Sequence, residues 1–179
     1  MTLATASRPL WSEGMLMCPQ HMQQQDLYHE QHLQTRLQAL SAAPWGVLSV
    51  QFDAPALKSG SLQLNNFRGV LPDGTPANFD ALSSQRPPSR AIGPHFLTKV
   101  ETLGVYLGLP LMREGVANYA LSSDASGAQR FRGIIRRVFD LTLARNEREL
   151  QVSEPALVLL FEGEPHKDYA ALKIGEILR

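Results

Sequence analysis

Short segments in which apolar and polar residues alternate dominate the chain after residue 45. The clearest runs from Leu103 to Pro110, where every second residue is Leu or Val. This period of two is typical of a half-buried β-strand. Further segments of this kind lie at 47–52, 62–64, 67–71, 131–143, 150–152, 157–161 and 169–174. The intervening stretches carry turn residues: Lys58-Ser59-Gly60, Pro72-Asp73-Gly74 and 146–149. The pattern predicts an antiparallel β-sandwich or barrel and argues against a parallel sheet.

One segment, residues 19–41, instead predicts a helix. Pro19 suits a first helical turn, and no further Gly or Pro occurs before Pro44. Seven of the chain's twelve Gln lie between Gln20 and Gln38, which leaves little apolar surface. Such a helix is marginal alone in water. We expect it either to lie on the domain surface or to project toward helices outside this chain. Its apolar residues form a stripe roughly 60° wide that also contains Asp26, His29 and Glu30; they are Met22, Leu33, Leu37 and Leu40.

The remaining segments are irregular. Residues 1–18 are expected to form an extended arm, because Pro9 disfavours helix at the residue before it. The stretches Ala81–Pro94 and Ser122–Gln129 are rich in small, polar and proline residues, and we expect loops there. Such loops serve as contact surfaces or are merely mobile, and the sequence leaves both readings open.

The amino-acid composition argues against several classes of function. The 17 Lys and Arg balance 17 Asp and Glu, which argues against a nucleic-acid binder. The single cysteine, Cys18, rules out an internal disulfide framework and fits a reducing compartment. The longest uninterrupted apolar stretch, 156–161, is too short to cross a bilayer, and no secretory signal precedes it. We therefore expect one cytoplasmic domain with no direct membrane insertion.

No group of residues converges on a catalytic or metal site. His29 and His32 are three residues apart, whereas zinc proteases use a spacing of four. Cys18 precedes a helix, but a buried inert thiol is the simpler reading. Arg130, Arg132, Arg136 and Arg137 either bind a phosphate or, more simply, guard an edge strand. The preference of Asp for tight turns explains the presence of Asp73 without a catalytic role. We predict no enzyme, no cofactor and no metal.

The N-terminal string Trp11-Ser12-Glu13-Gly14-Met15, followed by Pro19-Gln20-His21-Met22-Gln23-Gln24-Gln25, is more specific. It resembles the signature of the TssK family, the trimeric baseplate components of bacterial type VI secretion systems. Later landmarks resemble family segments in the same order, namely Tyr28, Glu30, Trp45-Gly46, Gly69–Thr75, Tyr106–Leu111 and Leu159–Gly163. The resemblance covers most of the chain. It departs at Met22, where Phe is usual, and at Leu172-Lys173-Ile174, where Leu-Pro is usual.

The resemblance implies a mainly β fold, an antiparallel β-sandwich like the shoulder of phage receptor-binding proteins, with one N-terminal α-helix. We expect 1–179 to form a single N-terminal domain, comprising an arm (1–18), a helix (19–41) that joins a neck, and a sandwich (45–175). The implied function is that of a structural adaptor. This domain would dock the baseplate wedge, made of TssF and TssG with TssE. Absent C-terminal parts would contact TssL and TssM of the membrane complex, and the full protein would be a homotrimer, cytoplasmic and placed at the inner face of the inner membrane.

The interface candidates lie in the arm and the helix start. We expect Trp11 and Met15 to pack where the helix meets the sandwich, with Gly14 allowing a tight chain path. The glutamines would face partner helices. The full set is Trp11, Glu13, Gly14, Met15, Pro19, Gln20, His21, Gln23, Gln24 and Gln25.

A second reading of the sequence is a β-sandwich that binds a carbohydrate or small ligand in the Ala81–Pro94 loop. The chain has two Trp and four Tyr, spread widely, and this disfavours a sugar site.

Overall fold

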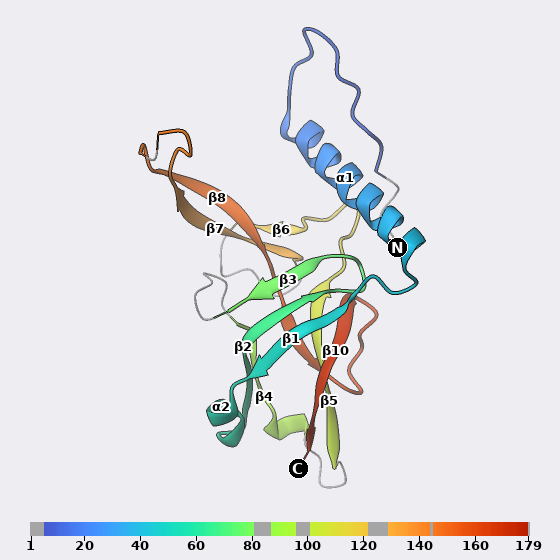
Figure 1. Ribbon diagram of the computed structural model, residues 1–179, viewed down its shortest axis with the longest axis vertical. Coiled ribbons are helices and arrows are strands. Elements are labelled where there is room, and N and C mark those ends of the chain that lie inside the picture. Colours follow the sequence, from blue (N-terminus) through green and yellow to red (C-terminus); the bar gives the residue numbers. More distant parts are fainter. Residues whose placement is uncertain (1–5, 81–86, 96–100, 122–128, 144, 179) are drawn as a thin grey trace.

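The body of the molecule is a pair of facing antiparallel sheets (Figure 1). The computed structural model of the protein describes residues 6–80, 87–95, 101–121, 129–143 and 145–178. In the first sheet the strand order is β1-β2-β3, and β4 pairs with the other half of β2. In the second sheet β5 lies between β10 and β9. The bounds are β1 Gly46–Phe52, β2 Ser61–Val70, β3 Pro76–Phe79, β4 Ser89–Ala91, β5 Thr102–Pro110, β9 Val158–Phe161 and β10 Tyr169–Leu178.

The core lies between these two sheets. Alternate residues of β2 point inward, as do residues of β5 and β10, so the period-two pattern of the sequence becomes a buried face. Phe67 and Phe161 are the largest fully buried side chains. Their neighbours in the core include Leu62, Leu64, Leu71, Leu107, Leu109 and Leu172. The predicted antiparallel β-sandwich is confirmed.

A third sheet, in the order β6-β7-β8, extends beyond the sandwich. It contains β6 (Tyr119–Ala120), β7 (Phe131–Val138) and β8 (Arg148–Pro155). Strands β7 and β8 form an antiparallel hairpin, and β6 pairs with β7 in parallel over two residues, a local exception to the antiparallel expectation. The turn expected at 146–149 is shorter, because β8 already begins at Arg148 and pairs it with Val138.

Several short elements were not expected. Helix α2 (Ala54–Lys58) follows Asp53, whose carboxylate accepts a hydrogen bond from the Ala56 N–H at 2.9 Å. A side chain of this type caps a helix start, and Pro55 fits the first turn. In the stretch predicted as the Ala81–Pro94 loop, residues 81–86 lie outside the described residues, but the remainder includes β4 and the start of a 3-10 helix, Gly93–His95. Of the second predicted loop, residues 122–128 also lie outside the described part.

Helix α1 spans Pro19–Leu40, where the sequence predicts a helix over 19–41. It lies at one end of the molecule, beyond the sandwich, and Leu178 lies near the opposite end (Figure 1). None of its residues is buried. A chain segment that continued after β10 would therefore start at the end remote from α1. A neck that includes α1 would require that segment to return along the sandwich.

Candidate interaction surface

The arm runs back along α1 and is held by side chains of the helix. The Ala6 N–H donates to Gln31 Oε1 at 2.8 Å, and the Trp11 indole N–H donates to Gln25 Oε1 at 3.1 Å. The Trp11 ring also lies beside His21, with 6.0 Å between the ring centroids. Two of the glutamines on α1 thus bind the chain's own arm.

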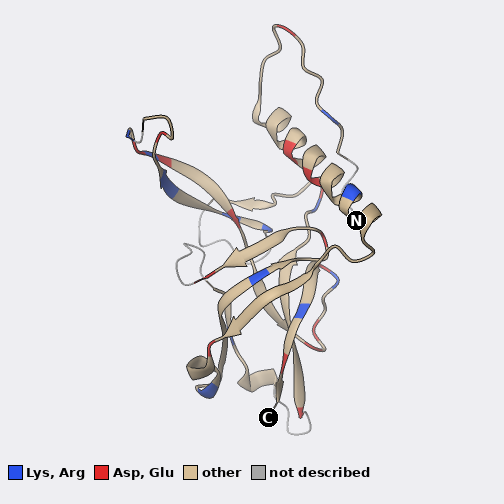
Figure 2. Ribbon diagram, viewed as in Figure 1, with Lys and Arg blue, Asp and Glu red and all other residues tan. Residues whose placement is uncertain are grey.

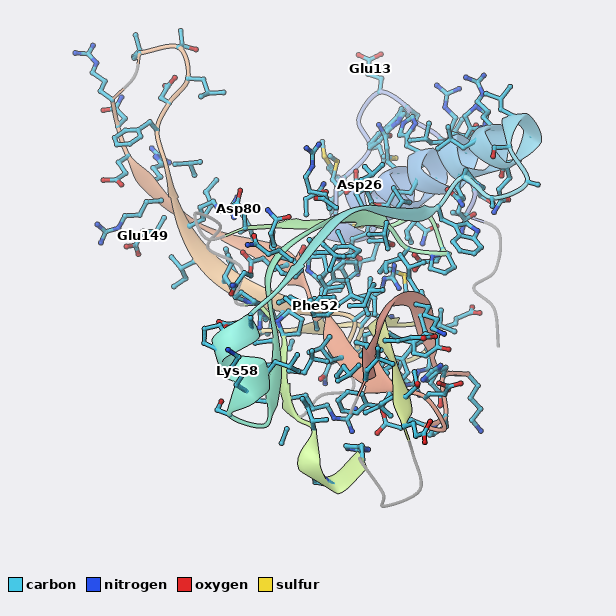
Figure 3. The ribbon with its side chains drawn as sticks, turned by 60° about the horizontal axis from the view of Figure 1, so that its bottom comes forward. Glu13, Asp26, Phe52, Lys58, Asp80 and Glu149 are labelled. Carbon is cyan, nitrogen blue, oxygen red and sulfur yellow. The ribbon has the colours of Figure 1, made fainter. Side chains whose placement is uncertain are left out.

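A tight turn brings the arm back to the helix start. The Met15 N–H donates to the Ser12 carbonyl at 3.3 Å, and Gly14 has a φ of 77°, a value that glycine adopts without strain. Glu13 lies at the tip of this turn (Figure 3). At the helix start, the Cys18 N–H donates to His21 Nδ1 at 3.2 Å, which satisfies one of the N–H groups left free there. Cys18 Sγ lies 3.0 Å from the same nitrogen.

These contacts correct the expected position of Trp11. Its partners are His21 and Gln25 of α1, not the junction with the sandwich, and 44% of the residue is exposed. Gly14 does permit the tight path that we expected. Met15 is half-buried. The remaining candidates, Pro19, Gln20, Gln23 and Gln24, are exposed on the first turns of the helix.

The middle of α1 meets the body at the turn between β2 and β3. Gly74 of this turn has a φ of 87°, and a Cβ there would overlap the side chain of Gln34. Gln34 Nε2 is buried without a hydrogen-bond partner among the described residues. One turn earlier on the helix, partial desolvation raises the pKa of Glu30 above its ordinary 4.5, and the nearby Arg130 opposes this shift. Desolvation is also the main reason that the pKa of Tyr119 is raised.

Arg130 also holds the β2–β3 turn in place, through hydrogen bonds from its guanidinium group. Its guanidinium donates to Asp73 Oδ2 and Thr75 Oγ1, both at 2.6 Å, and to the Pro110 carbonyl at 2.8 Å. The side chain is 8% exposed. Asp73 Oδ1 meanwhile accepts from the Thr75 N–H at 3.0 Å. Turn chemistry therefore explains the role of Asp73 Oδ1, whereas Asp73 Oδ2 forms a partly buried ion pair with Arg130. This ion pair links the β2–β3 turn to the ends of β5 and β7.

The other arginines of the predicted basic cluster also face carboxylates. Arg132 and Arg136 share a face of β7, as predicted, and lie 3.7 Å and 3.6 Å from Glu154. Arg137, on the opposite face, lies 3.2 Å from Glu149. β6 pairs with β7 only at Phe131 and Arg132, so along the rest of β7 one edge is unpaired in the described residues, and the interpretation of Arg136 and Arg137 as guards of that edge stays a prediction. Carboxylates already compensate these guanidinium groups, which weakens the alternative of a phosphate site.

A second ion pair joins the two sheets of the sandwich. Arg90 of β4 makes a bidentate contact with Glu164, with N–O distances of 2.7 Å and 2.5 Å, and donates to the Leu159 carbonyl at 2.9 Å. A shallow open depression lies beside this pair, in the region where a ligand site was the alternative reading. Among the described residues that line the depression, Tyr169 is the one aromatic residue, and the carboxylate of Glu164 is bound to Arg90. This lining does not support a sugar site.

We expect Glu164→Gln to lower the free energy of unfolding at pH 7 by about 1–2 kcal/mol, allowing for solvent screening. The hydrogen bonds from Arg90 are the main reason that the pKa of Glu164 lies below its ordinary 4.5. The carboxylate therefore stabilises the fold above pH 4.5, and this contribution is lost as the pH falls through the lowered pKa. Urea unfolding at several pH values measures it. Glu176→Gln, at an exposed ion pair, is the control and should change little.

Two parts of the molecule carry several exposed apolar side chains each, while others lie on the rest of α1, on β1 and elsewhere. One is the arm tip together with the first turns of α1, called the arm patch here, which comprises Leu10, Leu16, Met17 and Met22. The other is the outer part of the β7–β8 hairpin, called the hairpin patch, which comprises Ile135, Phe139, Leu141, Leu143 and Leu150. The sequence analysis missed the hairpin patch, because it assigned 131–143 to an ordinary half-buried strand. The sequence does carry one indication of exposed apolar residues. In 139–143, apolar residues continue to alternate with polar ones through the turn at Asp140.

Positions of Lys and Arg and of Asp and Glu are distributed along the described ribbon (Figure 2). Among the described residues, no three His, Cys, Asp or Glu side chains come together as a metal site requires. No helix in the described ranges has the length and hydrophobicity needed to cross a membrane.

A comparison with known protein families shows to which family this chain belongs. Residues 21–179 match the family model described as bacterial type VI secretion, VC_A0110, EvfL, ImpJ, VasE. The chain belongs to this family, which is the TssK family that the N-terminal string predicted. The type VI secretion system baseplate component TssK1 of Pseudomonas aeruginosa is a TssK-family relative, 35% identical over 175 residues. The match covers 96% of this chain and 38% of TssK1, so the chain spans well under half of that relative.

Solved TssK-family structures share the fold. A crystal structure of TssK is similar with a TM-score of 0.84 and 29% identity, over 97% of this chain and 38% of that one. A chain of a TssK-TssF-TssG baseplate subcomplex is similar with a TM-score of 0.86 and 22% identity, over 98% of this chain and 57% of that one.

Proposed function

We propose that this chain is the part of a type VI secretion baseplate adaptor that docks on the wedge formed by TssF and TssG with TssE. Family membership carries the proposal, since the matched relative TssK1 is named as a baseplate component. The likeness to a chain of a TssK-TssF-TssG subcomplex adds support at the level of the fold. The function is then mechanical, with no catalytic step. The ion pairs of Arg130 and Arg90 fit this role, because they link separate strands of the fold.

We assign wedge docking to the arm patch. It lies at the end of the molecule remote from Leu178, so a partner seated there would not collide with segments that follow β10 (Figure 1). It is rich in large apolar side chains and uncharged glutamines, and Glu13 at the arm tip is its one nearby carboxylate in the described chain before Asp26. Patches of this kind are typical of protein–protein contacts rather than of sites for charged ligands.

The longer protein would then be a cytoplasmic homotrimer at the inner face of the inner membrane, with TssL and TssM bound by parts outside this chain. The self-contact would use surfaces of this chain that its own fold leaves exposed.

Co-purification tests the wedge assignment. The tagged chain, expressed with TssF, TssG and TssE of the same organism, should retain them through gel filtration. Loss of all three under conditions where the chain stays folded would contradict it.

A further inference from the structure

Strand β7 has one edge that is paired only at its inner end. β8 pairs with β7 along its whole length, whereas β6, on the other side, reaches only Phe131 and Arg132. The outer part of β7 belongs to the hairpin that extends beyond the sandwich (Figure 1). A two-stranded ribbon is marginally stable in water, and a third strand stabilises it. The free edge of β7 is therefore a template for a further strand.

The hydrogen bonds at the inner end of β7 show which backbone groups point to this edge. The Phe131 N–H donates to the Asn118 carbonyl at 3.0 Å, on the β6 side. Successive residues alternate between the two sides of a strand, and the register of β7 with β8 continues without a bulge to Val138. The N–H and C=O groups of Ile135 and Arg137 therefore point to the free edge, where the described residues offer them no partner.

An apolar side chain of the hairpin patch lies beside these backbone groups. Ile135 is 71% exposed, and its neighbour on the β8 side is Gln151. On its other side is the position that a strand in line with β6 would take. Directly opposite residues of paired strands lie on the same face. An apolar residue of an added strand would therefore cover Ile135.

The same edge is basic. β7 has three arginines and no carboxylate, and β8 has one arginine and two glutamates, so the glutamates compensate only part of the charge of the two strands. Arg137 Nε donates to Glu149, and its two terminal nitrogens donate to no group among the described residues. Arg136 lies on the opposite face, and its side chain is 52% exposed. A strand with two successive carboxylates would place one beside each of these arginines.

The free edge of β8 is less suited to such a strand. By the same alternation Pro155 of β8 points to that edge, and proline has no N–H to donate. Glu149 also lies there and would repel an acidic segment. The β7 edge of a second copy, in turn, would bring arginines opposite arginines. The charges on the hairpin thus favour an acidic strand, and they favour it at β7.

We propose that the free edge of β7 binds an extended acidic segment of another protein as an added strand. An apolar residue of that segment covers Ile135, and its carboxylates lie beside Arg136 and Arg137. Backbone hydrogen bonds supply affinity, and the side chains supply specificity. The guard prediction for the arginines is compatible with this role, because they repel the same edge of a second copy and attract an acidic strand. The surface is separate from the arm patch, so the proposed wedge contact does not depend on it.

Titration of the isotope-labelled chain with a synthetic peptide tests the proposal. The probe contains Thr-Val-Glu-Glu-Val-Thr, which reads the same in both directions and so fits a parallel or an antiparallel added strand. Nuclear magnetic resonance should show chemical-shift changes concentrated in 133–138 and slower hydrogen exchange at the Ile135 and Arg137 amides. The same peptide with Lys in place of both Glu should bind about tenfold more weakly or less.

Three results of this titration would overturn the proposal. The first is that neither peptide binds, in which case the arginines only guard the edge. The second is equal binding of the two peptides, or protection of amides elsewhere in the chain. The third is protection of the Ile135 and Arg137 amides without peptide as the chain is concentrated, because a second copy would then occupy the edge.

A proline substitution tests the backbone part of the contact. Ile135→Pro removes an N–H that points to the free edge, and proline is tolerated where that group faces solvent, so the melting temperature should change little. Binding of the Glu peptide should fall about tenfold or more, because one backbone hydrogen bond and the apolar contact are lost. Ser153→Pro is the matched control, because its N–H points to the free edge of β8. Equal binding by the two variants would contradict the proposal.

A charge reversal tests the specificity without touching the backbone. Arg137→Glu should remove the preference for the Glu peptide over the Lys peptide. Arg113→Glu, at an exposed position outside the hairpin, makes the same change in net charge and should keep the preference. If the two charge variants behave alike, the arginine at the edge does not select the strand and the proposal fails. Binding to TssF and TssG is measured separately, so the proposed function can stand in that case.

Discussion

Replacing Arg130 with methionine should lower the free energy of unfolding by about 2–3 kcal/mol, because the buried guanidinium makes charge-assisted hydrogen bonds with the partly exposed Asp73 and with the Pro110 carbonyl. Among the described residues, Asp73 would keep only the Thr75 N–H as a donor, and the Pro110 carbonyl would lose the hydrogen bond from Arg130. Because the turn that carries Asp73 also supports Gln34, we expect α1 to loosen as well. Urea unfolding measures the first effect, and hydrogen exchange of the α1 amides measures the second.

The matched control is Arg137→Met on the same strand. The Arg137 side chain is 69% exposed, and within the described residues its one ion pair is with Glu149. Its removal should change stability by less than about 0.5 kcal/mol. If the two substitutions have equal effects, Arg130 is not the anchor described above.

Phe67→Ala should also cost about 3–5 kcal/mol, because it opens a cavity in the core. Phe67 is fully buried on β2 and stacks with Phe79 of β3 at a centroid distance of 6.1 Å. Thermal or urea unfolding gives the measurement. Phe139→Ala, on the exposed hairpin, is the control for the chemical change. It should leave the free energy of unfolding almost unchanged. A destabilisation by Phe139→Ala as large as that by Phe67→Ala would show that the hairpin belongs to the core.

The sequence predicted most of the sandwich, since its strands are half-buried and half-buried strands carry a period of two. It missed β3, β4 and β6, which are four residues long or shorter and leave too few positions for a period. It also missed α2, where the Asp53 cap and Pro55 were the available signal. Pairing partners far apart in the chain, such as Arg130 with Asp73 and Arg90 with Glu164, depend on topology, and local patterns do not contain it.

The sequence predicted which residues belong to the candidate surface, but not how their side chains contact one another. The N-terminal string marked the arm and α1, yet the expected position of Trp11 followed from the preference of indole for cores. The glutamines instead provide acceptors along the helix, and the arm uses two of them. The hairpin patch could not be assigned as exposed from sequence, because the same alternation describes a strand that packs on a sheet and a strand that projects from it.

The most direct test of the central claim, that the arm patch docks the baseplate wedge, is a binding titration of the chain against the purified TssF–TssG complex. The variant with Leu16→Ser and Met17→Ser changes two exposed side chains and should keep its fold. The matched control is Leu48→Ser, on the outer face of β1, where the residue is 75% exposed. The account predicts wild-type affinity for the control and a loss of about tenfold or more for the arm variant, as for truncated apolar anchors. Equal affinities for the wild type and the arm variant would contradict it.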